Sequence, residues 1–223
     1  MVEFVKYEEP KSAKLYKFGK FSVSTIELKH LSFALFMTIL TIIVHQEGLE
    51  ILNPKKLFTL NVLLLFVAYI FSIGLGFILH EFGHKLVAQH YGFISEFRAD
   101  FTMLIFMFFF AMFSGFIFLA PGAVMILGRV SRRQNGIISV AGPLVNLVLA
   151  LIFIIFSILF PSNGFLGYIF SIGIYVNAFL GLFNMLPFWV LDGKKVLAWN
   201  KQVYFLVVIA LGGILYLKIK GLF

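Results

Sequence analysis

The sequence predicts an all-α polytopic membrane protein with about five to six membrane-embedded helices. Hydrophobic residues make up 61% of the 223 residues, and charged residues only 13%. The hydrophobic residues form long uninterrupted runs, not the alternating or amphipathic spacing of a soluble core. The charged residues gather at the ends of these runs. Both observations indicate segments that cross a bilayer.

Six apolar runs follow one another along the chain, at residues 31–44, 57–79, 101–127, 137–160, 165–191 and 203–217. A membrane-spanning helix needs about 20 apolar residues. The first and last runs are shorter than that, so we expect flanking residues to extend them or a different tilt.

Residues 1–30 precede the first run as a polar arm that carries six lysines. Within the arm, residues 21–27 alternate enough to predict a short strand. The run at 31–44 is followed by HQEGLE and not by a small-residue cleavage site, so we expect no cleavable signal peptide. We therefore divide the chain into an arm, 1–30, and a membrane-embedded domain, 31–223.

The second run ends in His80-Glu81-Phe82-Gly83-His84. Residues four apart lie about 400° around a helix, so His80 and His84 share one face, one turn apart. Both imidazoles can reach one Zn²⁺, while Glu81 can address a water on the metal. This is the spacing that zinc hydrolases use.

Chance rarely produces this motif. With 5 histidines in 223 residues and eight glutamates, about 0.004 occurrences per chain are expected at random. The alternative is that both histidines reach toward the membrane surface while Glu81 pairs with Lys85, four residues on. We favour metal binding.

A catalytic zinc normally has a third protein ligand. The chain has no cysteine, so the candidates are histidines and carboxylates: His30, His45, His90, Glu96, Asp100 and Asp192. Asp192 follows Pro187, which should break the helix and let residues 188–191 run extended. Irregular backbone at membrane depth occurs only where protein or a water-filled cavity surrounds it. The alternative for Asp192 is an ordinary helix-end carboxylate beside Lys194 and Lys195.

Three motifs together carry a family resemblance: HEFGH, AGPLVN at 141–146 and NMLPFWVLDG at 184–193. They resemble the intramembrane zinc metalloproteases of the site-2 protease family, in an archaeal or bacterial-type core at about 57–195 without an appended domain. The resemblance implies that His80, His84 and Asp192 hold one Zn²⁺ per chain and that Glu81 is the catalytic acid/base. The family's second proline and second glycine are replaced by Val190 and Lys194.

A shared metal requires His84 and Asp192 to lie at the same membrane depth, so the chain must cross an even number of times between them. Runs 137–160 and 165–191 supply two crossings. We therefore expect run 101–127 not to cross once. Its 27 residues hold Gly115, Pro121 and Gly122 and predict a re-entrant hairpin, part of it extended, because two full spans need about 40 residues.

The net charge of +8 is scattered and forms no basic face, so we expect no nucleic-acid partner. With a cytoplasmic N-terminus, fourteen of the 18 lysines and arginines lie inside and four outside, which agrees with the positive-inside tendency. The outside four are Lys55, Lys56, Lys218 and Lys220. This orientation predicts a multi-pass protein of the cell membrane whose active site lies toward the cytoplasmic side.

Three asparagines interrupt otherwise apolar spans. Asn146 lies one turn from Gly142, and we expect it to hydrogen-bond a substrate strand or the oxyanion. The family resemblance places Asn146 and Asn184 in the active site. For Asn177, a hydrogen bond between helices is at least as good an interpretation.

The sequence thus predicts a zinc-dependent intramembrane endopeptidase acting on transmembrane segments of membrane proteins or on peptides. The alternatives are a metal or proton transporter and a catalytically inactive scaffold. A transporter would place ionisable residues on several spans, whereas we find one cluster. A scaffold would have no need of Glu81. The sequence does not identify the substrate or the oligomeric state.

Overall fold

The fold consists mainly of long apolar helices, as predicted. The structure is a computed structural model and describes residues 14–19, 21–114, 122–161 and 164–222. In this part of the chain, five helices are long and apolar enough to cross a membrane: Thr25–Glu47 (α1), Leu60–His90, Arg132–Leu159 (α6), Phe165–Asn184 (α7) and Lys201–Ile219 (α9). Their number and composition confirm a polytopic, helical membrane protein.

Helix α1 begins earlier than the sequence analysis expected. The strands β1 (Leu15–Phe18) and β2 (Phe21–Ser24) form an antiparallel hairpin. The strand predicted over 21–27 ends at Ser24 because the Ser24 side chain accepts the backbone N–H of Glu27 and caps α1. Three residues of the expected strand therefore form the first turn of α1. Lys6, Lys11 and Lys20 of the arm lie outside the described residues.

The helix that carries the HEFGH motif is continuous but not uniform. It runs through α3 (Leu60–Tyr69), a π-helical turn η2 (Ile70–Gly74) and α4 (Leu75–His90). The short elements η1 (Leu49–Leu52) and α2 (Pro54–Leu57) connect it to α1. The helix thus extends eleven residues beyond the apolar run 57–79, which places the histidines inside a helix and not at its end.

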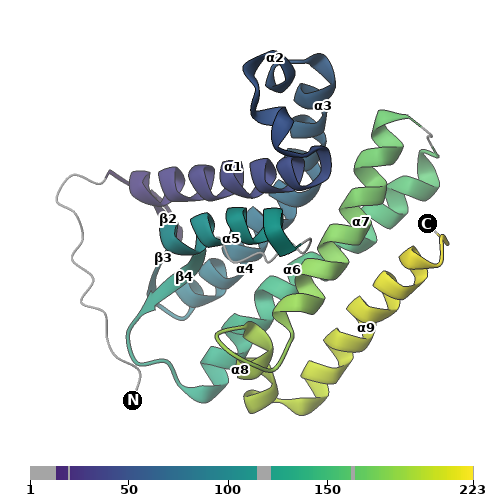
Figure 1. The fold of residues 1–223 in the computed structure, drawn as a ribbon. Coiled ribbons are helices and arrows are strands. Elements are labelled where there is room, and N and C mark those ends of the chain that lie inside the picture. The colour runs from purple at the N-terminus through teal and green to yellow at the C-terminus, as the bar shows by residue number, and fades with distance from the viewer. Residues whose placement is uncertain (1–13, 20, 115–121, 162–163, 223) are drawn as a thin grey trace.

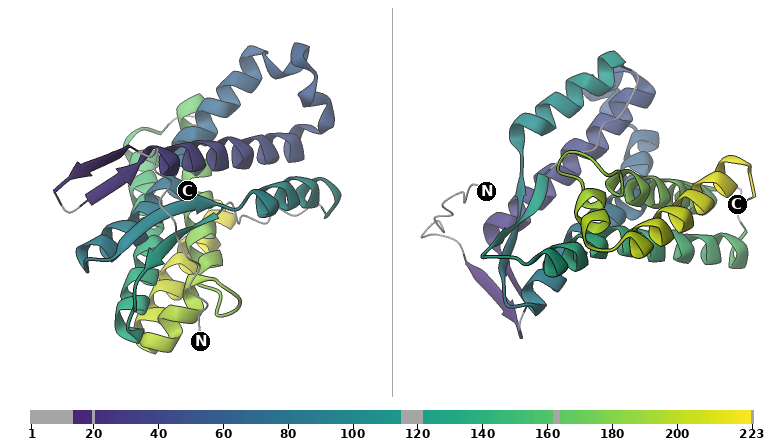
Figure 2. Two further views of the ribbon diagram at one scale, coloured as in Figure 1. Left: turned by 90° about the vertical axis from the view of Figure 1, so that its left-hand side faces the viewer. Right: turned by 90° about the horizontal axis from the view of Figure 1, so that it is seen from below.

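After α4 the chain forms β3 (Ile94–Ala99) and α5 (Phe101–Ser114) and then returns beside β3 as β4 (Gly122–Leu127). Strand β3 pairs antiparallel with β4, so that Ala99 lies opposite Gly122, and α5 lies between them in the chain. The prediction that part of run 101–127 is extended is therefore confirmed, and the return of β4 to β3 is what the predicted re-entrant hairpin requires. Gly115 and Pro121 lie outside the described residues. Figures 1 and 2 show β3, β4 and α5 between α1 and the bundle of α6, α7 and α9.

Helices α6 and α7 lie side by side and run in opposite directions (Figure 1). Ser162 and Asn163, between them in the sequence, lie outside the described residues. After α7 the chain bends through Pro187 into α8 (Asp192–Trp199). The segment 188–191 is not helical, as predicted, but it turns instead of running extended: Trp189 has φ 57. The turn brings α8 back beside α6 (Figure 1).

A buried ion pair next to the HEFGH motif joins α4, α1 and β3. Lys85 Nζ lies 2.5 Å from Glu27 Oε2 of α1 and donates to the Ser95 carbonyl of β3 at 2.9 Å. The other Glu27 oxygen accepts the backbone N–H of Phe97 at 2.9 Å. Both side chains are fully buried. The alternative in which Glu81 pairs with Lys85 is therefore wrong, because the Lys85 ammonium group is bound by Glu27 and the Ser95 carbonyl.

We predict that Lys85→Ala lowers the free energy of unfolding by about 3–5 kcal/mol, because it leaves the Glu27 carboxylate buried without its cation. The measurement is equilibrium unfolding in mixed micelles. Lys56→Ala, which removes a surface pair with Glu50, is the control and should change stability little. Equal effects of the two substitutions would contradict the structural role of the buried pair.

Candidate metal centre

Three side chains from two distant parts of the sequence converge on one point. His80 and His84 lie on successive turns of α4 with their Nε2 atoms 3.1 Å apart. The Asp192 Oδ2 atom of α8 lies 3.0 Å from His84 Nε2 and 3.5 Å from His80 Nε2. All three residues are buried. They are the group in the described part of the chain whose ligand atoms are close enough to share a metal ion.

The hydrogen bonds of the two imidazoles leave the inward nitrogens free to bind a cation. His84 Nδ1 lies 2.8 Å from the Ile138 carbonyl oxygen, which can only accept. The Nδ1 atom therefore carries the proton, and Nε2 presents a lone pair. His80 Nδ1 lies 2.5 Å from Asn146 Oδ1 in the same arrangement. Two lone pairs and a carboxylate oxygen facing one another is the donor set of a metal site.

The spacing of the three atoms fits zinc. Ligands at about 2.0–2.1 Å from a tetrahedral zinc lie about 3.3 Å from one another. The observed separations of 3.0, 3.1 and 3.5 Å scatter around that value. Helix α6 provides the necessary room at Gly142, where an added Cβ would lie 2.5 Å from His84 Nε2 and 2.6 Å from His80 Nε2. The glycine therefore keeps the space around the ligand atoms open.

Asp192 reaches the histidines because the loop after α7 folds back tightly. Gly193 packs against the Met185 and Leu186 carbonyls, where any Cβ would collide with the backbone. Burial by itself raises the pKa of the Asp192 carboxyl, but His84, His80 and Lys195 outweigh burial and hold that pKa well below its ordinary value. A carboxylate must be ionised to bind a metal, and the Lys195 ammonium group, 3.6 Å from Asp192 Oδ1, favours the ionised form.

Glu81 faces a cavity of about 150 Å³ beside the group of His80, His84 and Asp192. Its Oε2 atom is buried, and no hydrogen-bond partner for it lies among the described residues. The carboxylate also lies beside the backbone of Val124 in β4. A buried acceptor directed into a cavity is suited to bind a water molecule there.

The cavity is lined by both halves of the protein. Besides the ligands and Glu81, it is bordered by Gly122, Ala123, Val124 and Ile126 of β4, by Asn184 of α7 and by Val190 and Leu191 of the loop. The sequence analysis predicted that part of run 101–127 is extended but missed that this part borders the metal site. The only local signal was the Pro121-Gly122 pair before a short apolar stretch.

The other predicted ligand candidates lie elsewhere. His30 accepts the Ala99 backbone N–H, His45 Nδ1 bonds to the Ala111 carbonyl, and Glu96 pairs with Arg98. His90 and Asp100 are exposed at helix ends.

The predicted asparagines separate into two kinds. Asn184 borders the cavity, as expected. Asn146 is fully buried and its amide is engaged by His80, Gly76 and Asn177, so the expected contact with substrate or oxyanion does not fit its position. Asn177 bonds between helices, the alternative that the sequence analysis had kept open.

Comparison with known proteins agrees with this geometry. Residues 68–166 match peptidase family M50. The chain is 41% identical over 152 residues to "Putative zinc metalloprotease MJ0611" of Methanocaldococcus jannaschii, which covers 68% of this chain and 80% of that relative. This chain belongs to peptidase family M50. The family is that of the site-2 proteases, so the resemblance seen in the three motifs is confirmed.

A second relative of this M50 protein is "Zinc metalloprotease MJ0392" of the same organism, 26% identical over 185 residues. The match covers 82% of this chain and 44% of that relative. No solved structure is significantly similar to the chain. The family and the buried His-His-Asp group together identify a zinc metalloprotease with zinc as its cofactor, carried on a multi-pass membrane protein.

We predict that purified Asp192→Ala loses its zinc, because two histidines alone hold the ion poorly, whereas Glu81→Gln retains zinc equimolar with the chain. Metal content after dialysis is measured by mass spectrometry. Glu96→Ala, which removes a carboxylate outside the cavity, is the matched control and should retain zinc. Full zinc in Asp192→Ala would exclude this carboxylate as a ligand.

Proposed function

We propose that this M50 protein is an intramembrane endopeptidase that hydrolyses peptide bonds in or near transmembrane segments of membrane protein substrates. The observation that carries the proposal is the position of the metal centre. Its two histidines and Glu81 lie on a helix long and apolar enough to span a membrane, beside a cavity bordered by a strand. A substrate that reaches this cavity has to come from the membrane or from its surface.

In this proposal His80, His84 and Asp192 hold the zinc and Glu81 is the general base. Zinc supplies a Lewis acid that polarises a carbonyl and lowers the pKa of a bound water to about 7. Glu81 accepts the proton of the attacking water and later delivers it to the leaving amine. Its buried Oε2 atom, which has no hydrogen-bond partner among the described residues, and its place beside the proposed ligands support this role.

Strand β4 supports an extended substrate backbone in the cavity. In the described part of the chain, β4 pairs with β3 alone, and its residues border the cavity. An edge strand presents unpaired N–H and C=O groups, which bind an added strand through main-chain hydrogen bonds. A transmembrane helix must unwind locally to bind this way. Substrates with glycine or proline near the cleaved bond should therefore be preferred.

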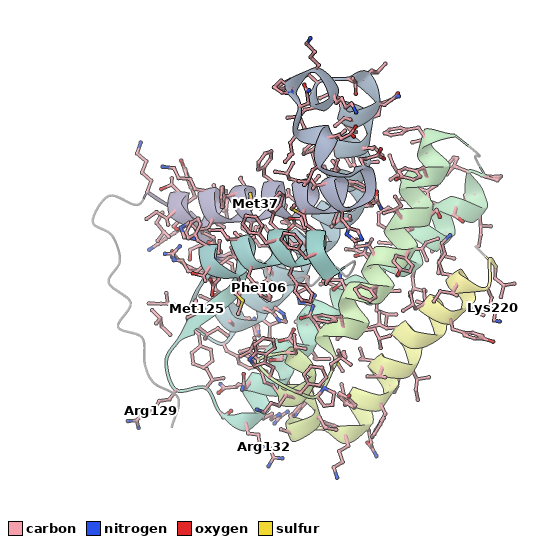
Figure 3. All side chains as sticks on the ribbon, viewed as in Figure 1. Met37, Phe106, Met125, Arg129, Arg132 and Lys220 are labelled. Atoms are coloured by element: carbon pink, nitrogen blue, oxygen red, sulfur yellow. The ribbon has the colours of Figure 1, made fainter. Side chains whose placement is uncertain are left out.

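A cytoplasmic N-terminus places the metal centre toward the cytoplasmic side. Arg129 and Arg132 lie near the start of α6, at the opposite end of the helix bundle from Lys220 (Figure 3). Arginines at one end and fewer cations at the other support this orientation by the positive-inside tendency. The sequence-based boundary between an arm, 1–30, and a membrane domain, 31–223, falls inside α1, so we propose that the membrane domain begins at Thr25.

A membrane metal transporter is the second candidate. It would need further ligand groups along a path through the membrane. In the described ranges, the His80, His84 and Asp192 group is the one that could hold a metal. The presence of Glu81 beside it favours hydrolysis over transport.

We predict that the wild-type protein in liposomes cleaves a transmembrane peptide with a glycine pair in its span, and that Glu81→Gln lowers the rate about 10²–10⁴-fold with zinc retained. Removal of zinc by a chelator should abolish cleavage, and zinc should restore it. Cleavage is read by mass spectrometry of the products. A Glu81→Gln variant with the wild-type rate would exclude Glu81 as the base.

The orientation has its own test. The chain contains no cysteine, so single cysteines introduced by Arg129→Cys and Lys220→Cys can be labelled without background. In intact cells, a membrane-impermeant thiol reagent is expected to label position 220 and not position 129. The reverse pattern would invert the proposed topology.

A further inference from the structure

We infer that Asn177 of α7 is a positioning residue of the zinc site: through Asn146 of α6 it sets the tautomer and orientation of His80. The inference rests on the proposed role of His80 as a zinc ligand. Its basis is a series of hydrogen bonds that connects α7, α6 and α4. In this series, the donor and acceptor of each bond fix the orientation of the next side chain.

The chain begins at two backbone carbonyls. Asn177 Nδ2 lies 2.9 Å from the Gly173 carbonyl oxygen and 3.5 Å from that of Ser72. Carbonyl oxygens only accept hydrogen bonds, so the amide nitrogen of Asn177 must face them. The Oδ1 atom of Asn177 is thereby turned toward α6.

Asn146 bonds to Asn177 through its amide nitrogen and to His80 through its amide oxygen. Its Nδ2 lies 3.0 Å from Asn177 Oδ1 and 3.2 Å from the Gly76 carbonyl oxygen, two acceptors that require the amide nitrogen at this place. The Oδ1 atom of Asn146 therefore faces His80 Nδ1, at 2.5 Å. His80 Nδ1 must donate, so its Nε2 lone pair is directed toward His84 and Asp192.

Burial of both asparagines disfavours any other orientation of their amide groups. Asn146 and Asn177 are both 0% exposed. In the apolar interior of a membrane protein, no water replaces a lost partner, and an unpaired amide is costly. Reversing either amide would place N–H groups against N–H groups or oxygen against oxygen. The whole chain of hydrogen bonds therefore has one favourable direction.

The HEFGH helix is shaped to admit Asn177. The Ser72 carbonyl belongs to the π-helical turn η2, where the regular hydrogen-bond ladder is interrupted. One turn further, an added Cβ at Gly76 would lie 2.5 Å from Asn177 Oδ1. The absence of a side chain at Gly76 is therefore a condition for the Asn177–Asn146 bond.

The Nδ1 atoms of the two histidines have different hydrogen-bond partners. His84 bonds directly to the Ile138 backbone carbonyl, at 2.8 Å. His80 depends on two side chains in sequence. A change at Asn177 should therefore affect His80 and leave His84 in place, which a general loosening of the bundle would not do.

The first test is zinc affinity, measured by competition with a chromophoric chelator. Because partners of metal-bound histidines typically contribute 10–100-fold to affinity, we expect Asn177→Ala and Gly76→Ala each to weaken zinc binding about tenfold. Gly74→Ala is the matched control, since its added Cβ would meet the flexible end of Leu35 at 2.9 Å and no member of the chain. Ile174→Ala, a buried truncation on α7, controls for loosened packing.

The second test is the tautomer itself, read from nitrogen-15 spectra of histidine-labelled, metal-free protein. We expect His80 to carry its proton on Nδ1 in the wild type and both controls, and a mixture of tautomers in Asn177→Ala and Gly76→Ala. The His84 signal should not change. If one of these two variants fails to fold, the other decides.

Unchanged affinity and an unchanged His80 tautomer in Asn177→Ala or Gly76→Ala would overturn the inference. A separate variant, His80→Ala, tests the ligand assignment. If it binds zinc as the wild type does, the proposed metal site fails, while the tautomer measurement still decides whether Asn177 orients His80.

Discussion

The apolar interior of the membrane requires each polar group around the metal centre to find its partner within the protein. In water, an imidazole, an amide or an ammonium group loses little when a partner is absent. In hydrocarbon the same loss costs several kcal/mol. This constraint explains why the site is built from paired groups: His84 with the Ile138 carbonyl, His80 with Asn146, and Lys85 with Glu27. Glu81 is different, because one of its oxygens is left for the cavity.

Close packing between α4 and α6 follows from the same requirement. The partners of both histidines, Ile138 and Asn146, lie on α6. They come within reach because Gly83 packs against the Ala141 carbonyl and Gly142 leaves the ligand atoms uncovered. Small residues at such a contact let two helix backbones approach closely. The glycine of the AGPLVN motif, Gly142, therefore makes room for the two histidines, and Pro143 follows it inside α6.

The segment between the first two motifs connects the metal centre to the rest of the chain. Strand β3 is held against α4 and α1 by the Lys85–Glu27 pair, and β4 is held by β3. Because β3 pairs with β4 and β4 borders the cavity, the buried ion pair supports one wall of the cavity through β3. Gln89 adds to this support through bonds to Ser22 of β2 and the Ser95 carbonyl. The β1–β2 hairpin, α1 and the β3–β4 sheet thus support one side of α4.

The sequence by itself determined the membrane class, the spacing of His80 and His84, and the position of Glu81, because these depend on composition and on the period of one helix. It also predicted that run 101–127 does not cross the membrane once, because His84 and Asp192 can share a metal only at the same membrane depth. Local reasoning left six candidates for the third ligand, three of them carboxylates, and the family resemblance implied Asp192. The tertiary structure brings Asp192 to 3.0–3.5 Å from the histidines. It also decided that Lys85 pairs with Glu27 and that Asn146 holds His80 and does not face the cavity. Pairings between residues 58 and 66 positions apart depend on how helices pack, and no local pattern records that.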